Sequence, residues 1–440
     1  MDPQKYQSSG VAAVPTYPGT ERISGVYPQR QQGLFLQRTR VLGGRISWPQ
    51  WRKVADIVRR YSQRQAFHIT TRQDIELHDM AGPVIKDIQE ELANAELITN
   101  GACGDTVRNI TVCTGCSSDP NAGGVLPVAE FLHRTLMARA FNLPRKFKIS
   151  ISGCSLACAK CWLNDLGFIL QPNGTFTVVG AGSLGPRPGL GIELCKGLAV
   201  RYVAPMCIAA LEFFEQTGDR ENRHRARLRH VREKLGDERF KTELCAIFER
   251  VKSSQTWPDV ALAKPNHNIK LLWRLQLPNG NISSDEALHL ADAAQPTGAE
   301  LRINLEHGLE LYGSQIFRLP DNLATLENLP IITACPGLSS CARALTDTWS
   351  IAEAIRKRIV NSNQPNLHIN ISGCPNCCAH SAVADIGLIG MRRNREGQSA
   401  ECYRILTGGH NGIDGCLAKG DDVIFAEDVP AAVEGILSLK

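Results

Sequence analysis

The chain has 440 residues, of which 43% are hydrophobic and 21% charged, and its formal net charge is +5. This length suits two or three domains, and this composition is typical of a globular protein with an apolar core. The first residues carry no apolar run, and no apolar stretch approaches the roughly 20 residues of a membrane span. We therefore expect a cytoplasmic protein without membrane insertion, in which 16 cysteines indicate metal or redox chemistry rather than disulfides.

The first predicted elements form a small β–α–β unit. Apolar residues alternate from Leu34 onward and predict a strand, and a Gly-Gly pair then marks a turn. Residues Trp48–Gln63 carry apolar side chains at helical spacing. A further strand is expected within Phe67–His78. This order predicts an α+β sheet with helices on one face.

Four blocks of the first half recur in the second half in the same order. They pair LFLQRTRVLGGRIS (34–47) with LLWRLQLPNGNIS (271–283), FHITTRQDIELH (67–78) with LRINLEHGLELY (301–312), TVCTGCSS (111–118) with TACPGLSS (333–340), and KISISGC (148–154) with HINISGC (368–374). The shared order predicts an internal duplication with a pseudo-two-fold axis. Each half continues beyond its first unit into a larger α+β segment.

The segment Thr256–His267 carries two prolines and is interpreted as the boundary between the halves. The predicted segments are 25–80 and 81–255 in the first half, and 264–325 and 326–440 in the second. Before the boundary, Gly218–Val231 is rich in arginine. We interpret this run as a solvated helix face with its own acidic partners, because it has no interleaved aromatic residues for base stacking. No nucleic-acid partner is expected.

Four basic residues are present in one half only. They are Arg72, Arg108, Lys146 and Lys148, and the matched positions of the second half carry Glu306, Pro330, Asn366 and His368. Each of these cations alone is most simply a surface or ion-pair residue. A pseudo-two-fold arrangement would instead bring them to the interface between the halves, where ligand sites are common.

Four cysteines of the second half have the spacing of an iron–sulfur site. Cys335 and Cys341 form a Cys-x5-Cys pair, and Cys374 and Cys378 form a Cys-x3-Cys pair that also contains Cys377. Four thiolates on two loops are the usual ligands of a [4Fe–4S] cluster. Zinc is the alternative, but four-thiolate zinc sites usually have shorter spacing in both loops. Buried thiols without a ligand are the remaining alternative.

Together these motifs resemble the sirohaem-dependent sulfite and nitrite reductases. The resemblance rests on TTRQ (70–73), the Arg-Asn pair at 108–109, LPRKFK (143–148), Cys-x5-Cys and SGCPNxC, in the family's order over roughly residues 25–435. It implies a duplicated, pseudo-two-fold α+β fold with ferredoxin-like half-domains. It also implies one sirohaem coupled to one [4Fe–4S] cluster, with Cys378 bridging the cluster and the sirohaem iron.

The resemblance assigns roles to further residues. Arg72, Arg108, Lys146 and Lys148 match the family's substrate-binding set, and they would hold an oxyanion and relay protons to it. The cofactor would be contacted by Asn109 and Asn376, and by Arg38 and Arg40, which share one face of the early strand. Arg38 has a counterpart in Arg274, so a structural role is its alternative.

The substrate prediction depends on Lys148. In the family the nitrite enzymes tend to carry Asn at this position, and doubly charged sulfite gains more from an extra cation. We therefore predict the six-electron reduction of sulfite to sulfide. The alternatives are reduction of nitrite to ammonia, reduction of another sulfur compound, and a non-catalytic electron-transfer subunit. The glycine-rich segment Gly180–Gly191 lacks the strand-to-helix context of a dinucleotide site, so a separate donor, ferredoxin-like or a flavoprotein, is expected.

The first half departs from the family in carrying its own cysteines. They are Cys113, Cys116, Cys154, Cys158 and Cys161. SGCSLACAKC reproduces the Cys-x3-Cys pair, Cys113 aligns with Cys335, and Cys116 or Cys161 is the candidate fourth ligand. We hypothesise a second [4Fe–4S] cluster that serves as an electron-entry relay. A vestigial thiol set and a zinc site are the alternatives.

Overall fold

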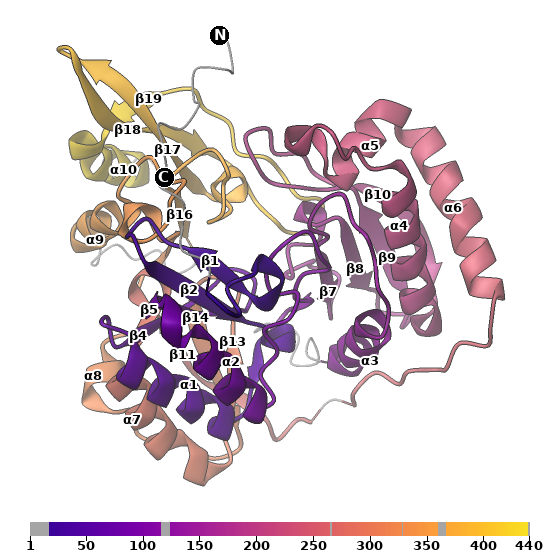
Figure 1. Cartoon of the computed structure of the whole chain (residues 1–440), viewed down its shortest axis with the longest axis horizontal. Coiled ribbons are helices and arrows are strands. Elements are labelled where there is room, and N and C mark those ends of the chain that lie inside the picture. Colours follow the sequence, from indigo (N-terminus) through magenta and orange to yellow (C-terminus); the bar gives the residue numbers. More distant parts are fainter. Residues whose placement is uncertain (1–16, 116–123, 265, 328, 360–366, 439–440) are drawn as a thin grey trace.

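The structure is a computed structural model that describes residues 17–115, 124–264, 266–327, 329–359 and 367–438. Within these residues the chain forms four sheets, three with five strands and one with four. Figure 1 shows the larger unit of the first half at the right, that of the second half at the upper left, and the two smaller units together at the lower left. The predicted α+β class is confirmed.

The two smaller units are ferredoxin-like and pack against each other. The first has the strand order β1 (Val26–Pro28), β2 (Leu34–Thr39), β5 (Ile75–Ala81), β4 (Ala66–Ile69) and β12 (Asn281–Ser283), with helices α1 (Trp48–Tyr61) and α2 (Ile85–Asn94). The second has the order β11 (Lys270–Gln276), β14 (Gly308–Gly313), β13 (Glu300–Ile303) and β3 (Arg45–Ile46), with α7 (Ser284–Ala294) and α8 (Asp321–Ala324). The indole nitrogens of Trp48 and Trp51 donate to backbone oxygens of the other half, so both units share one core.

Each smaller unit lends one strand to the other. β12 of the second half pairs antiparallel with β4, and β3 of the first half pairs antiparallel with β13. Both exchanged strands follow a tight turn in which two residues have positive φ, Gly43 and Gly44 in one half, Asn279 and Gly280 in the other. At Gly44 a Cβ atom would lie 2.1 Å from the backbone oxygen of Ile303, so glycine lets the strand approach its neighbour.

The two larger units repeat one topology. The first has the strand order β10 (Ile192–Leu198), β9 (Phe176–Gly180), β8 (Leu166–Leu170), β7 (Ile149–Ser152) and β6 (Thr111–Val112), with α3 (Leu126–Met137), α4 (Val203–Thr217), α5 (Leu228–Leu235) and α6 (Asp237–Ser253). The second has β15 (Ile331–Ala334), β16 (His368–Ser372), β17 (Ile386–Arg395), β18 (Gln398–Thr407) and β19 (Val423–Phe425), with α9 (Thr348–Ile359) and α10 (Val429–Ser438). In both, the first three strands in chain order run parallel and the last two antiparallel, which confirms the duplication.

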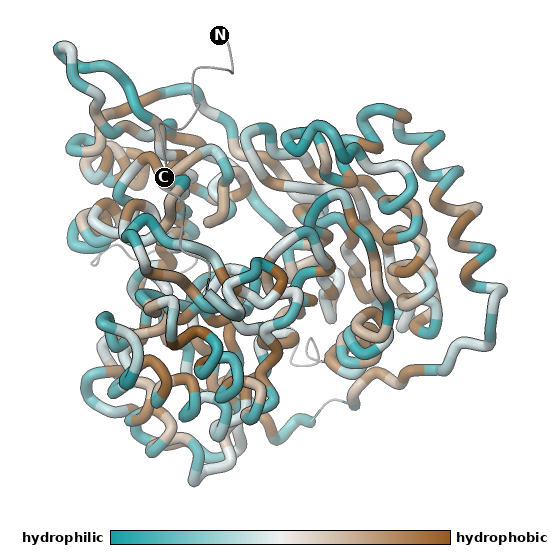
Figure 2. Tube along the Cα trace, viewed as in Figure 1, coloured by the Kyte–Doolittle hydropathy of each residue, from teal (hydrophilic) through white to brown (hydrophobic). Residues whose placement is uncertain are grey.

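Each larger unit has a hydrophobic core of its own, beneath amphipathic helices. In α6, for example, Phe240, Leu244, Phe248 and Val251 are buried, and brown and teal segments alternate along this helix in Figure 2. Among the described residues, no helix combines the length and the apolar character that a membrane span needs. The predicted domain boundaries stay predictions.

The arginine-rich run Gly218–Val231 is only in part the solvated helix face with acidic partners that the sequence suggested. Most of it precedes α5, and Arg227 and Arg229 are buried. Arg227 pairs with the fully buried Asp165 at 2.7 Å, and Arg229 donates to Ser183 Oγ at 2.9 Å. Arg223 and Arg225 are exposed and pair with Asp105 and Glu233, as predicted. The prediction was wrong for the two buried arginines, because the charge pattern does not show which cations a buried carboxylate will recruit.

Candidate functional site

The TTRQ turn of the first half lies against the cysteine loop of the second half. It joins β4 to β5, and Thr71 Oγ1 donates a hydrogen bond to the backbone oxygen of Cys378 at 3.2 Å. The guanidinium of Arg72 donates to Asn164 Oδ1 at 2.9 Å and to the backbone oxygen of Asn109 at 2.5 Å. The sequence motif therefore sits at the interface between the halves.

Arg108 and Asn109 are buried beside this turn. Arg108 donates to the backbone oxygens of Ala102 and Gly104, and Asn109 Nδ2 donates to the backbone oxygen of Arg72 at 3.1 Å. In the described part of the chain, three buried polar atoms here have no hydrogen-bond partner, namely Arg72 Nε, Arg108 Nε and Asn109 Oδ1. Such atoms are costly unless a ligand satisfies them.

Lys146 and Lys148 complete the cationic set just before β7. Burial, together with Arg227 and Arg108, lowers the pKa of Lys146 to about 7. Burial also lowers the pKa of Lys148 well below its ordinary value, with Arg72 and Lys146 adding to the effect. The Cys378 thiolate opposes both shifts. Arg72, Lys146 and Lys148 thus lie close enough to repel one another on the side that faces Cys378. An anion bound between them would relieve that repulsion.

The four second-half cysteines follow the ends of parallel strands β15 and β16, at one edge of the sheet. Burial raises the pKa of Cys335 and of Cys341, and it raises the pKa of Cys374 to about 12. The Cys378 thiolate raises the pKa of each of the three further. All four sulfur atoms therefore share one neighbourhood. The amide of Gly373 donates to Cys335 Sγ at 3.2 Å, a contact that favours a thiolate.

Two other residues of this loop differ in exposure. Cys377 is fully buried, and its Sγ accepts a hydrogen bond from the amide of Ala382 at 3.2 Å. It therefore faces the core behind the loop, and burial raises its pKa to about 11. Asn376 is exposed, on the open side of the turn.

The first-half cysteines also gather in one place. Cys113, Cys154, Cys158 and Cys161 belong to one small apolar cluster with Leu305, while Cys116 lies outside the described residues. Within the described chain, no three His, Cys, Asp or Glu side chains of either half converge on a point that suits a single metal ion.

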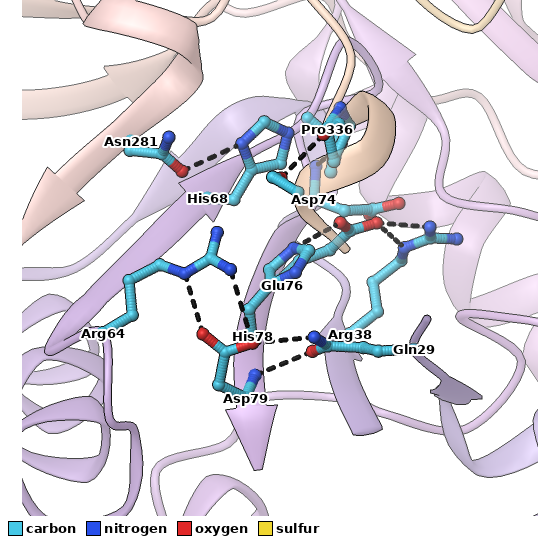
Figure 3. Close-up of polar contacts among 12 residues, drawn as sticks. Gln29, Arg38, Arg64, His68, Asp74, Glu76, His78, Asp79, Asn281 and Pro336 are labelled. Carbon is cyan, nitrogen blue, oxygen red and sulfur yellow. Dashed lines mark hydrogen bonds and ion pairs between the residues drawn. The ribbon is translucent and has the colours of Figure 1, made fainter. Parts of the chain in front are cut away.

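Arg38 and Arg40 are both held by groups of the first half. Arg38 forms an ion pair with Glu76 (Figure 3), and its counterpart Arg274 pairs with Glu310 at 3.1 Å. The repeated pair favours a structural role for Arg38. Arg40 donates to the backbone oxygens of Gly101 and Val107. Its role toward the cofactor stays a prediction.

The site contains two residues that the sequence did not single out, Lys160 and His380. Lys160 Nζ lies 3.1 Å from His380 Nδ1, 3.1 Å from Glu306 Oε1 and 2.9 Å from the backbone oxygen of Leu305. A cavity of about 10 Å³ is lined by Lys160, His380, Arg72 and Lys148 among others. The repeat offered a signal, because Lys160 and His380 occupy matched positions after the two SGC motifs.

The residues present fit a polycarboxylate macrocycle next to an iron–sulfur cluster. The buried guanidinium nitrogen atoms that lack partners suit anionic groups, and the clustered thiols suit a cubane. The cluster would be held by the thiolates of Cys335, Cys341, Cys374 and Cys378. The Cys378 thiolate would be shared between the cluster and the sirohaem. When bound, the pair supplies electrons to a ligand on the macrocycle.

Comparison with known proteins assigns the family. The nitrite and sulphite reductase 4Fe-4S domain matches residues 103–251 and 327–439, and the nitrite/sulfite reductase ferredoxin-like half domain matches residues 27–95. The assimilatory ferredoxin-dependent nitrite reductase of Haloferax mediterranei is 28% identical (94% of this chain, 80% of the relative), and the ferredoxin–nitrite reductase of Synechococcus elongatus is 29% identical (92% and 86%).

A sulfite reductase is similar to the same extent. Sulfite reductase [ferredoxin] 2 of Mycolicibacterium paratuberculosis is 28% identical over 90% of this chain and 80% of its own length. The solved structure of Mycobacterium tuberculosis NirA matches with a TM-score of 0.78 at 21% identity, covering 95% of this chain and 86% of that chain, and it confirms the duplicated fold. This chain belongs to the nitrite and sulphite reductase family, which uses sirohaem and a [4Fe–4S] cluster.

Proposed function

We propose that this chain reduces nitrite to ammonia with electrons from a ferredoxin. The observation that carries the proposal is the crowding of Arg72, Lys146 and Lys148 opposite Cys378. A small oxyanion is the ligand that such a set of cations can bind without an unpaired charge. Nitrite and ferredoxin are favoured because most of the similar relatives carry the name ferredoxin–nitrite reductase.

The cations have distinct tasks. Arg72 and Arg108 are already fixed by hydrogen bonds to backbone oxygens, so they offer rigid, preorganised donors to the anion. Lys146 has a pKa of about 7, which suits a group that gives up a proton near neutral pH. Lys148 would regain its positive charge beside Arg72 when an anion binds, because the anion offsets the repulsion that lowers the pKa of this lysine. Together they hold the anion and supply protons as its oxygens leave as water.

Sulfite is the second candidate substrate, and Lys148 is the observation that favours it. Sulfite carries a second negative charge and has a larger volume than nitrite, so it gains more from a fourth cation. One similar relative is named a sulfite reductase. A non-catalytic carrier is less well supported, because it would have no use for a buried set of repelling cations that lowers stability.

Steady-state turnover with both anions tests the proposal. Purified holoenzyme is supplied with reduced ferredoxin, and ammonia or sulfide is measured. We expect kcat/KM for nitrite to exceed that for sulfite by at least about tenfold, which corresponds to about 1.4 kcal/mol. A higher value for sulfite would transfer the assignment to sulfite, and no turnover of either anion would reject both reductase activities.

Two variants refine this experiment. Lys148→Asn removes one cation from the set, and Lys196→Asn removes an exposed lysine of the same unit as the matched control. We expect Lys148→Asn to lower kcat/KM for sulfite by about 10- to 100-fold and for nitrite by less, because Coulomb attraction scales with the charge of the anion. Equal losses for both anions would remove Lys148 as a determinant of specificity.

A further inference from the structure

The first half repeats the strand end and the amide–sulfur hydrogen bond that present Cys335 in the second half. Cys113 follows β6, which pairs in parallel with β7, the strand that ends just before Cys154. In the same way Cys335 follows β15, which pairs in parallel with β16, the strand that ends just before Cys374. The amide of Gly153 donates to Cys113 Sγ at 3.0 Å, just as the amide of Gly373 donates to Cys335 Sγ at 3.2 Å. A backbone N–H that points at sulfur is the contact that stabilises a metal-bound thiolate.

The second loop is repeated as closely. Ala157 and Cys377 are matched and both have φ of 56°, while Lys160 and His380 have φ of 56° and 64°. The amide of Ala157 donates to the backbone oxygen of Cys154 at 3.4 Å, and the amide of Cys377 donates to that of Cys374 at 3.3 Å. Non-glycine residues rarely adopt these conformations twice in four positions. Cys154 and Cys158 are therefore presented on the same backbone frame as Cys374 and Cys378.

The charge around Cys113 fits a cluster. Arg302, from β13 of the other half, donates to the backbone oxygen of Thr114 at 2.6 Å and lies over the ring of Tyr312 at 3.6 Å. Arg45 is close enough for its charge to interact with the Cys113 thiolate. Both arginines also pair with one carboxylate, that of the more exposed Glu300, so the three side chains together keep a net positive charge. A cubane with thiolate ligands carries net negative charge, so this remaining positive charge offsets part of the cost of placing the cluster in the interior.

From this geometry we propose that Cys113, Cys154 and Cys158 bind a second iron–sulfur cluster, of the [4Fe–4S] type. Cys161 is not among its ligands. It occupies the place of Ser381, its Sγ donates to the backbone oxygen of Phe168 at 3.5 Å, and it is fully buried behind the loop. Among the described cysteines of this half, three thiolates therefore carry the site, and Cys161 packs in the core.

Counting iron and acid-labile sulfide in the anaerobically purified wild-type chain tests the inference directly. Two cubanes and the sirohaem iron amount to about nine iron and about eight sulfide per chain, whereas one cubane and sirohaem amount to about five and four. The count is normalised to sirohaem from its visible absorption. A result of about five iron, or of about one zinc per chain in place of the second cluster, overturns the proposal.

Two cysteine variants locate the site. Cys158→Ala is expected to lose about four iron and four sulfide while the sirohaem absorption is kept, and Cys161→Ser, three residues away, is expected to keep the wild-type count. Unchanged iron in Cys158→Ala would contradict the assignment. If Cys158→Ala fails to fold, the wild-type count alone decides. Nitrite turnover is measured separately, so failure of this inference and failure of the proposed activity are distinguishable.

Discussion

Arg72 and Glu306 hold matched positions in the two repeats. Their contacts show how one substitution gives the two halves different roles at the interface. Arg72 faces the interface and keeps one nitrogen without a partner in the described chain. Glu306 is instead neutralised by Lys160, at 3.1 Å. Lys160 therefore serves two groups, since it also contacts His380. A cation from the first half thus keeps the acidic counterpart of Arg72 from opposing the anion site.

Removing the charge of Lys160 should destabilise the fold, because Glu306 then loses the cation with which it pairs. Lys160→Met leaves Glu306 largely buried without its partner, which costs about 3 kcal/mol and lowers the midpoint of thermal unfolding by several degrees. The double variant Lys160→Met/Glu306→Leu should regain most of that loss, because no uncompensated charge remains. Unfolding scans of both variants check this. A double variant as unstable as the single one would show that the pair is not the cause.

A second prediction at this scale concerns the protonation of Lys146. Its pKa is lowered to about 7, so its charge is complete below that pH and is lost as the pH rises through it. The pH dependence of kcat/KM reports the free enzyme, so kcat/KM for the anion should fall with a limb near pH 7. Lys146→Arg keeps its charge and should lose the limb. A pH profile of both proteins measures this; an identical limb in the variant assigns it to another group.

For single helices and strands, the spacing of apolar residues in the sequence predicted the structure of that segment. The helix expected over Trp48–Gln63 is α1, which ends at Tyr61 because the next residue leaves helical geometry. Its start is set by a capping box of Ser47 and Gln50, a signal repeated by Ser283 and Glu286 before α7. The strand exchange was not predictable in the same way. β3 and β12 are short, and their partners lie in the other half.

The turn before β3 provides a test of this exchange. Gly44→Ala would place a Cβ 2.1 Å from the backbone oxygen of Ile303, in addition to its positive φ. Gly174→Ala is the matched control, because Gly174 also has positive φ but has no atom within 4 Å of such a Cβ. The control should cost about 1 kcal/mol. Gly44→Ala should lower the unfolding midpoint at least twice as far; equal losses would show that close approach at β3 contributes nothing.

At the scale of the whole molecule, the duplication was readable because four blocks keep their order, and the cysteine pairs were readable because spacing encodes ligand loops. The residues that contact the site side chains from distant segments could not be predicted from the sequence. Arg227 belongs to a run that looked solvated, yet it pairs with buried Asp165 and lowers the pKa of Lys146. Lys160 reaches the site only because the two halves meet there. Such contacts depend on packing between distant segments, which no local pattern records.

Buried histidines at the joint of the smaller units make the whole fold sensitive to acid. Burial lowers the pKa of His68 to about 4, and it also lowers the pKa of His307. In the unfolded chain these imidazoles bind protons near pH 6.5. The stability is therefore complete above about pH 6.5 and is lost as the pH falls toward 4.

This acid sensitivity can be traced to one side chain. His68→Gln should reduce the loss of unfolding free energy between pH 6.5 and 4 by up to about 3 kcal/mol, seen as a smaller drop in the midpoint of thermal unfolding. His289→Gln, at an exposed position of α7, serves as the control and should follow the wild type. If both variants follow the wild type, the acid sensitivity arises elsewhere.

We propose that cations of the first half serve a reaction centre that is anchored by cysteines of the second half. The most direct measurement is kcat/KM for nitrite of Arg72→Gln beside the wild type, with the visible sirohaem absorption recorded on the same samples. We expect a loss of at least about 100-fold with unchanged absorption, since in our proposal Arg72 binds the anion and does not hold the cluster. Activity within about threefold of the wild type would contradict it.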